Sequence, residues 1–255
     1  MDTADPQGGP GRILIELGAC PSTQDVVREH ALAGAPAGTV CTAEHQTAGR
    51  GRRGRTWTET PGTALMFSYL ARLSRPPAEL GPLSLVVGIS LAEALPLGPR
   101  LRWPNDLVIG DRKLGGILVE LVTPPAGDPF AVIGVGINAN LTAAQLPPTD
   151  RLPATSLLVE GGEPVDRTAL RGLLLVALDR DLAAFDRDGF GPFAERWSAL
   201  DQIAGRDLEL RLPDGAIRGR CDGVDTEGRL LVAGRAYAAG EVERVLGGSA
   251  HPPTV

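Results

Sequence analysis

The sequence predicts an α+β protein, in which a mixed β-sheet flanked by helices precedes a small β-barrel. Two observations lead to this fold class. Strand-like and helical patterns alternate from residue 13 to about residue 203, and from about Gly205 apolar and polar residues alternate between the turn sequences PDG, TEG and AG. The second pattern is typical of short antiparallel strands joined by tight turns. With 255 residues, of which 43% are hydrophobic, the chain can bury an independent core.

The first half of the chain contains two helical and two strand-like patterns. A helix over 22–34 begins with the capping candidates Ser22 and Thr23 and ends at Gly34. A second helix, over 82–95, starts with a proline and is apolar enough to be buried. The strand-like runs are 38–46 and 63–73.

The second half begins with three strand-like runs, separated by turn-forming residues. These runs are 100–104, 113–122 and 130–141. A longer helical pattern over 166–189 follows a Gly-Gly turn, and 191–200 indicates one more helix.

The patterns divide the chain into four segments. We expect a disordered tail over 1–12, the mixed α/β body over 13–203, the β-barrel over 204–247 and a second disordered tail over 248–255.

Charge and composition argue against several classes of protein. The formal net charge of −6 disfavours broad binding to nucleic acid or to a membrane surface, so we expect neither DNA nor a membrane as a partner. The N-terminus lacks the basic and apolar regions of a signal peptide, and no apolar run approaches the ~18–20 residues that cross a bilayer. A cytoplasmic protein is therefore expected. The three cysteines and three histidines are scattered, which predicts no protein-built metal site.

The stretch TAGRGRRGRTWTE, residues 47–59, concentrates four arginines on a glycine-rich segment. Glycines let backbone N–H groups approach an anion, and guanidinium groups match the oxygens of carboxylates and phosphates. The lysine and hydroxyl residue of a Walker A loop are absent. Taken alone, this loop is either a solvated basic segment or an anion cradle, and Trp57 is either a core residue or a platform for a base.

Three further motifs offer chemistry. RWPNDL presents an amide and a carboxylate, Asn105 and Asp106, where a plain turn is the alternative. In DRKLGG, Lys113 is the sole lysine against 24 arginines, which suggests a position where arginine would not serve. GVGIN places two glycines before Asn138, although glycines in strands also mark bulges.

Together, and in this order, these motifs resemble those of the biotin protein ligase family. The resemblance runs from about Ser22 to Val245 and is most specific at AEHQTAGRGRRGRTW, WPNDL, DRKLGGILVEL and GVGIN. It implies a catalytic domain like that of class II aminoacyl-tRNA synthetases, followed by an SH3-like barrel. It also implies two reactions: biotin and ATP give biotinyl-5′-AMP and pyrophosphate, and a lysine of a biotin carboxyl carrier protein then accepts the biotin.

The resemblance assigns roles to individual residues. The biotin-binding residues that it implies are Ser22, Thr23, Gln24, Gln46, Arg50, Gly51, Arg52, Lys113, Gly115 and Gly116. The ATP-binding residues that it implies are Arg52, Arg55, Trp57, Asn105, Lys113 and Asn138. The catalytic residues that it implies are Lys113, Arg50, Arg52 and Asp106. Lys113 would reach the carboxylate and α-phosphate oxygens, and Asp106 would orient the incoming lysine or accept its proton.

The resemblance also implies partners. Mg²⁺ is expected with the ATP, held mainly by phosphates. The acceptor would be the biotin carboxyl carrier protein or domain of an acetyl-CoA, acyl-CoA or pyruvate carboxylase. A monomer and a homodimer are both compatible with the sequence.

The chain departs from the family pattern in three places. The usual Ser-Thr-Asn reads Ser22-Thr23-Gln24, and the lysine usual before Trp-Pro-Asn-Asp is Arg102. Some members carry an N-terminal winged-helix repressor, whereas about 20 residues precede Ser22 here. We therefore expect a monofunctional ligase without the DNA-binding domain.

Two alternatives stay open. A lipoate or octanoate ligase shares the fold and the acyl-transfer logic, but the arginine-dense loop ending in tryptophan favours biotin. A non-enzymatic nucleotide-binding protein could use the same basic loop. The net charge and the Lys113–Gly–Gly strand count against this second alternative.

Overall fold

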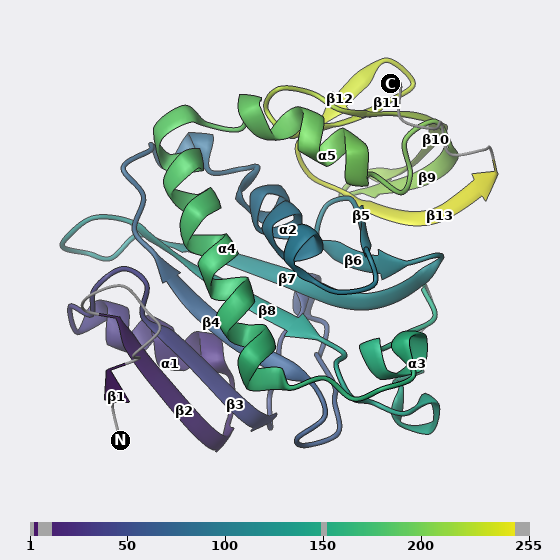
Figure 1. Cartoon of the computed structure of the whole chain (residues 1–255). Helices are drawn as coiled ribbons and strands as arrows, with labels where there is room; N and C mark the ends of the chain where they lie inside the picture. The colour runs from purple at the N-terminus through teal and green to yellow at the C-terminus, as the bar shows by residue number, and fades with distance from the viewer. Residues whose placement is uncertain (1–2, 5–11, 149–151, 248–255) are drawn as a thin grey trace.

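The structure, a computed structural model, describes residues 3–4, 12–148 and 152–247. The larger of its two sheets has eight strands in the order β1-β2-β3-β4-β8-β7-β6-β5 (Figure 1). Their bounds are β1 Thr3–Ala4, β2 Ile13–Cys20, β3 Val40–Gln46, β4 Leu65–Ala71, β5 Arg100–Arg102, β6 Asp106–Ile109, β7 Arg112–Val122 and β8 Phe130–Ile137. Strands β2 and β3 are parallel and all other neighbours are antiparallel, so the predicted mixed sheet is confirmed.

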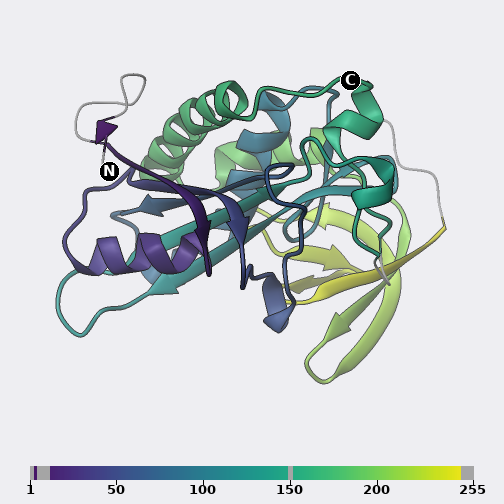
Figure 2. The same ribbon diagram turned by 90° about the horizontal axis from the view of Figure 1, so that it is seen from below.

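Helices cover both faces of this sheet. Within the described residues the α-helices are α1 Thr23–Leu32, α2 Leu83–Ala94, α3 Leu157–Gly161, α4 Arg167–Asp188 and α5 Ala194–Leu200. Short 3₁₀ segments lie at η1 Arg52–Gly54, η2 Pro77–Glu79, η3 Ala143–Gln145 and η4 Gly191–Phe193. Figure 2 shows α1 on one side of the sheet and α4 on the other. The predicted helices over 22–34, 82–95, 166–189 and 191–200 are all confirmed.

The two faces bury two different sets of apolar residues. Along β8, Val132 packs in a cluster with Val27 of α1, whereas Ile133 and Val135 belong to the large core that includes α2 and α4. Successive side chains of a strand point to opposite faces, so a strand covered on both sides needs apolar residues at nearly every position. This explains why the central strands are continuous apolar runs.

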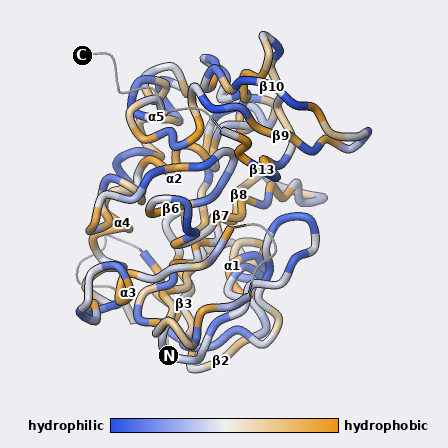
Figure 3. The backbone as a smooth tube through the Cα atoms, turned by 90° about the vertical axis from the view of Figure 1, so that its right-hand side faces the viewer, coloured by the Kyte–Doolittle hydropathy of each residue, from blue (hydrophilic) through white to orange (hydrophobic). Residues whose placement is uncertain are grey.

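The second sheet is the C-terminal barrel. Its strands are β9 Asp207–Leu212, β10 Gly215–Val224, β11 Leu230–Val232, β12 Arg235–Tyr237 and β13 Glu241–Gly247, in the order β12-β11-β10-β9-β13. All its pairings are antiparallel, which agrees with an SH3-like barrel. Hydrophobic and hydrophilic residues are interspersed along β9 and β10 (Figure 3), as expected for strands with one buried face.

The barrel packs directly on the body. The indole Nε1 of Trp103 donates to the carbonyl oxygen of Gly228 at 3.3 Å, and buried Arg102 donates to the carbonyl of Val242 at 3.0 Å. A Cβ atom on Gly228 would lie 2.6 Å from Pro82, so the two units approach too closely there for a side chain. Leu208 of the barrel belongs to the same buried cluster as α2.

Several sequence expectations needed correction or addition. Strand β2, strand β6 and helix α3 were not predicted from the sequence. Asn105 and Asp106 were expected to form a turn, but the turn covers residues 103–105 and Asp106 is the first residue of β6, paired with Arg102. The cause is the apolar run after Asp106, which hydrogen-bonds between β5 and β7 as a four-residue strand. Of the expected tails, Thr3–Ala4 pairs with β2, and the other residues of 1–11 and 248–255 lie outside the described residues.

A buried carboxylate joins the three helices on one side of the sheet. Asp181 of α4 accepts hydrogen bonds from Ser90 of α2 at 2.8 Å and from Arg196 of α5 at 2.7 Å, and Arg180 contributes another. Burial raises the pKa of Asp181, but these hydrogen bonds outweigh that effect and lower the pKa to about 2. The ionised carboxylate therefore stabilises this helix packing.

We predict that Asp181→Asn lowers the free energy of unfolding at pH 7 by roughly 1–3 kcal/mol, the usual size of a charge-assisted hydrogen bond. The folded state holds this proton less tightly than the unfolded chain, so ionised Asp181 stabilises above about pH 4 and its contribution is lost as the pH falls towards 2. Urea titrations of both proteins from pH 7 down to pH 3 measure the difference. A difference that does not shrink in acid would contradict the assignment.

Candidate active site

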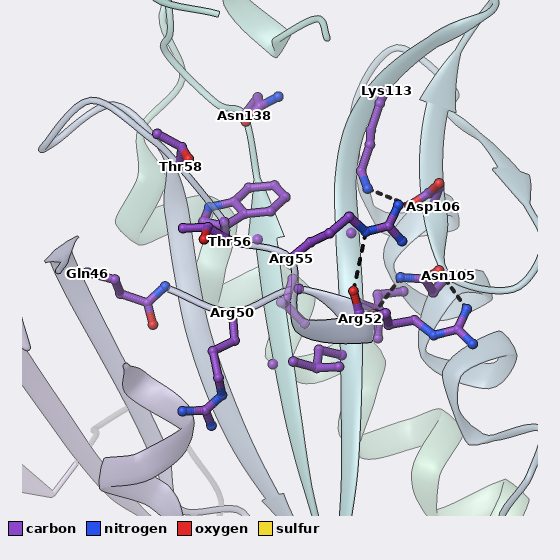
Figure 4. Close-up of a pocket in the computed structure, with 18 of the residues that line it drawn as sticks. Gln46, Arg50, Arg52, Arg55, Thr56, Thr58, Asn105, Asp106, Lys113 and Asn138 are labelled. Carbon is purple, nitrogen blue, oxygen red and sulfur yellow. Dashed lines mark hydrogen bonds and ion pairs between the residues drawn. The ribbon is translucent and has the colours of Figure 1, made fainter. Parts of the chain in front are cut away.

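A cavity of about 390 Å³ opens above the central strands of the larger sheet (Figure 4). Its lining comes from the start of α1, the end of β3, the glycine–arginine loop, strands β6, β7 and β8, and the segment near residue 152. Fourteen of the fifteen site residues predicted from the sequence line it: Ser22, Thr23, Gln24, Gln46, Arg50, Gly51, Arg52, Arg55, Trp57, Asn105, Asp106, Lys113, Gly116 and Asn138. Motifs spread over more than a hundred residues thus meet in one cavity.

Gly115 is the predicted residue that does not line the cavity. A Cβ atom there would lie 2.6 Å from the carbonyl oxygen of Gly136 on the adjacent strand. Its neighbour Gly116 faces the cavity, because successive residues of a strand point to opposite sides. In this structure Gly115 therefore serves the close packing of β7 on β8.

Hydroxyl and amide groups gather at one end of the cavity. The side-chain oxygen of Gln46 accepts hydrogen bonds from the backbone N–H of Thr23 at 2.7 Å and from its hydroxyl at 3.1 Å. The Thr23 hydroxyl also lies 2.8 Å from the hydroxyl of Ser68. Gln46 thus satisfies one of the free N–H groups at the start of α1, and the hydroxyl of Ser22, which occupies the N-cap position, makes no capping bond. Ser68 was not predicted, because a lone serine in an apolar strand carries no signal.

Gln24 forms part of the floor of this end. Its side chain is 4% exposed, and its Nε2 donates to the carbonyl oxygen of Leu118 at 3.1 Å. A Cβ atom at Gly134 would lie 2.9 Å from the Gln24 amide carbon, so the glycine provides the space for this longer amide. The first glycine of GVGIN is therefore a packing requirement.

The Lys113 ammonium forms an ion pair with Asp106, with Nζ 2.6 Å from Oδ1 (Figure 4). The two residues lie on neighbouring antiparallel strands, β7 and β6, where Asp106 is opposite Gly116 and Lys113 is opposite Val108, so the lysine side chain reaches Asp106 diagonally. Asp106 is 5% exposed, whereas the Lys113 side chain is 29% exposed. A Cβ atom at Gly116 would lie 3.4 Å from the ammonium nitrogen, so this glycine leaves room for the lysine to cross the strand.

The glycine–arginine loop is a compact turn over the cavity. The backbone N–H of Gly51 donates to the carbonyl of Arg55 at 2.7 Å, and that of Trp57 donates to Gly49 at 2.9 Å. Arg53 and Gly54 at its tip have φ values of 57° and 72°, a left-handed conformation that glycine adopts without strain. The backbone of the loop thus folds upon itself and its arginine side chains extend outwards.

The four arginines have different partners. Arg52 donates to the Asn105 side chain at 3.2 Å, while Arg53 and Arg55 both form ion pairs with Glu241 of the barrel. Arg50 points away from Lys113 and Asp106 (Figure 4), towards acidic groups at the cavity edge. Burial, together with the nearby charge of Arg53, lowers the pKa of Arg52. None of these carboxylate partners was predicted, because a single acid distant in sequence gives no signal.

Trp57 and Asn138 carry polar atoms without a partner among the described residues. A Cβ atom at Gly136 would lie 2.7 Å from the Trp57 ring, so the indole lies directly against β8. Its Nε1 is buried and has no hydrogen-bond partner in the described part of the chain. Asn138 is 3% exposed, and its Nδ2 donates to the carbonyl oxygen of Thr155. Its Oδ1 accepts no hydrogen bond from the described residues. Buried polar atoms of this kind indicate a ligand.

Within the described ranges, no three histidine, cysteine, aspartate or glutamate side chains group as a metal ion would need. No helix in the same ranges combines the length and apolar character required to span a bilayer.

The chain is similar in sequence and fold to known proteins. The model of the biotin/lipoate A/B protein ligase family matches residues 18–138. The bifunctional ligase/repressor BirA of Salmonella typhimurium is 41% identical over 199 residues, covering 76% of this chain and 62% of the relative. The biotin--[acetyl-CoA-carboxylase] ligase of Mycobacterium tuberculosis is 34% identical over 218 residues, covering 80% of this chain and 78% of the relative.

A solved structure gives the same result for the fold. The biotin protein ligase from Aquifex aeolicus in complex with biotin and ATP matches with a TM-score of 0.76 and 30% identity, covering 89% of this chain and 96% of that one. The chain spans about three fifths of the length of the bifunctional relatives. Sequence identity, fold and family model agree: the chain belongs to the biotin/lipoate A/B protein ligase family, among its biotin protein ligases.

Proposed function

We propose that this protein is an ATP-dependent biotin protein ligase, which makes biotinyl-5′-AMP and then transfers biotin to a lysine of a biotin carboxyl carrier protein. The observation that carries the proposal is the Lys113–Asp106 pair, which faces a cavity with hydroxyl and amide groups at one end and arginines along its edge. A cyclic urea has two N–H donors and one carbonyl acceptor. The hydroxyls of Ser22 and Thr23 and the amide of Gln46 offer complementary groups.

The first reaction brings two anions together. A carboxylate oxygen of biotin attacks the α-phosphorus of ATP, the bond to the β-phosphate oxygen breaks, and pyrophosphate leaves. The ammonium of Lys113 and the guanidinium of Arg52 offset the repulsion and the charge that develops on the phosphate oxygens. A loop that covers the mixed anhydride also keeps water from hydrolysing it.

The second reaction needs a neutral amine. The carrier lysine attacks the carbonyl carbon of the mixed anhydride, an amide bond forms, and AMP leaves with the bonding electrons. The attacking nitrogen must lose a proton, and Asp106 is a buried carboxylate at the cavity wall that can orient the amine or accept this proton. Lys113 holds that carboxylate in place through their ion pair.

The nucleotide has its own set of groups. The Oδ1 of Asn138 can accept a hydrogen bond from the adenine amino group, and the Trp57 ring supplies a flat apolar surface for the base. Mg²⁺ would come with the ATP and neutralise phosphate charge. Among the described lining residues Asp106 is the one carboxylate, and it is paired with Lys113, so the phosphates rather than the protein would supply most of the ligands.

The proposal also covers the acceptor protein, the cellular compartment and the domain bounds. The acceptor is a carrier protein or domain of a biotin-dependent carboxylase, and the compartment is the cytoplasm. All three cysteines are free and buried, which suits a reducing compartment. We assign the catalytic domain to 13–203 and the SH3-like barrel to 204–247. Biotin is favoured over lipoate because the Mycobacterium tuberculosis relative and the Aquifex aeolicus structure are named for biotin.

The direct test is ATP–pyrophosphate exchange with biotin, lipoate or no acid. We expect exchange that depends on biotin, followed by labelling of a carrier domain. Exchange with lipoate but not biotin would show a lipoate ligase, and nucleotide binding without exchange would show a non-enzymatic protein.

We predict that Lys113→Arg lowers the rate of pyrophosphate exchange by about 100-fold or more, since a preorganised charge at the developing phosphate anion is lost or displaced. The broader guanidinium must take the place of an ammonium that lies over Gly116 and 2.6 Å from Asp106. Arg112→Lys is the matched control, because Arg112, the neighbour of Lys113 on β7, is exposed and pairs with Glu160. Near-normal exchange in Lys113→Arg would refute the special role of the ammonium.

We predict that Gly136→Ala raises the KM for ATP about five- to twentyfold, a loss comparable with one base-stacking contact. The added Cβ would lie 2.7 Å from the Trp57 ring and must displace it. Gly18→Ala is the control, because a Cβ there meets no atom within 4 Å. Initial rates at varied ATP and saturating biotin measure the effect, and an unchanged KM would remove Trp57 from the nucleotide site.

A further inference from the structure

Four charged side chains form a cluster at the edge of the cavity. This rim cluster consists of Asp25 and Arg28 on α1, Arg50 in the loop and Glu120 on β7. Nη1 of Arg50 lies 2.7 Å from Oδ2 of Asp25, and its Nη2 lies 3.3 Å from Oε2 of Glu120. Arg28 forms ion pairs with the same two carboxylates. Two positive and two negative charges therefore alternate around the cluster.

Stability does not explain this arrangement. Each of the four side chains is 27–37% exposed, and ion pairs with such exposure contribute little to folding because water and salt screen them. The rim cluster instead restricts one loop residue. Arg50 has several rotatable bonds, and two carboxylates from separate elements fix the plane of its guanidinium group. The hydrogen bond to Asp25 above all raises the pKa of Arg50, so the group stays charged.

The four members are not equivalent. Arg50 lines the cavity, whereas Asp25, Arg28 and Glu120 do not. Arg50 uses one N–H of each terminal nitrogen for its two carboxylates, which leaves further donors of its five for a ligand. Two carboxylates beside a cavity for an organic anion would repel that anion, and Arg28 offsets their charge from the outer side.

The other loop arginines bind to different side chains. Arg53 and Arg55 pair with Glu241 of the barrel, and Arg52 contacts Asn105 near the Lys113–Asp106 pair. Arg50 is thus the loop arginine held by two carboxylates of the body, at the side of the cavity where Gln46 lies (Figure 4). Its position relates it to the organic acid rather than to the nucleotide.

We propose that Asp25 and Glu120 are positioning residues, which hold the guanidinium group of Arg50 where it attracts the carboxylate-bearing acid into the cavity. The inference rests on the proposed function. Preorganisation of a cationic donor lowers the cost of ordering it when the ligand binds, so its loss weakens binding of the acid and leaves the chemical step and the ATP site unchanged.

The test combines Asp25→Asn, Glu120→Gln and Arg50→Gln with the double variant Asp25→Asn/Arg50→Gln. We expect both acid-to-amide changes to raise the KM for biotin about five- to twentyfold, as for the loss of a charge-assisted contact, with kcat and the KM for ATP within about twofold. In the Arg50→Gln background Asp25→Asn should have no further effect, because Asp25 acts through Arg50. Glu209→Gln is the matched control, since its ion pair with Arg218 is also 2.7 Å long but lies in the barrel.

A KM for biotin within twofold of the parent in both Asp25→Asn and Glu120→Gln would overturn the inference. Effects of Asp25→Asn and Arg50→Gln that simply add would overturn it as well. In both cases the parent protein still exchanges pyrophosphate with biotin, so the proposed function stands. A parent protein that neither exchanges pyrophosphate nor binds biotin in calorimetry would overturn the proposed function and the inference together.

Discussion

The candidate site depends on holding concentrated positive charge in place before any anion arrives. Arg50, Arg52, Arg53 and Arg55 lie within six residues, and Lys113 faces the same cavity. Like charges this close repel one another, and long basic side chains are costly to order. Carboxylates from separate elements form ion pairs with these cations: Asp25, Glu120, Asp106 and Glu241. Arg50, Arg53, Arg55 and Lys113 each gain a carboxylate partner, and Arg52 is held by the Asn105 amide. The net charge of the chain remains negative.

A second constraint is close approach at the strands that form the floor of the cavity. Gly136 leaves space for the Trp57 ring and Gly134 for the Gln24 amide. A methyl group at either of these two positions would lie less than 3 Å from its neighbour. The glycines in these strands are therefore required by packing of functional side chains on the backbone, which outweighs their conformational cost within a strand.

The barrel takes part in the site although it lies at the end of the chain. Glu241 binds two loop arginines, and Arg102 and Trp103, directly before Pro104, donate to barrel carbonyls. The first two residues of the stretch RWPND therefore attach the barrel, and its last two, Asn105 and Asp106, line the cavity.

Apolar periodicity and dense motifs are local signals, so the sequence predicted the fold class, most of the helices and strands, and fifteen site residues, of which fourteen line the cavity. It missed β6, whose four residues are too few for a pattern, and it did not show that Gly115 packs against β8 outside the cavity lining. Which carboxylate forms an ion pair with which arginine became visible in the tertiary structure. Glu241 is nearly two hundred residues from the loop, and a solitary carboxylate has the same sequence signature whether it is solvated or paired. Pairing depends on distance in space, which register and packing set after the chain has folded.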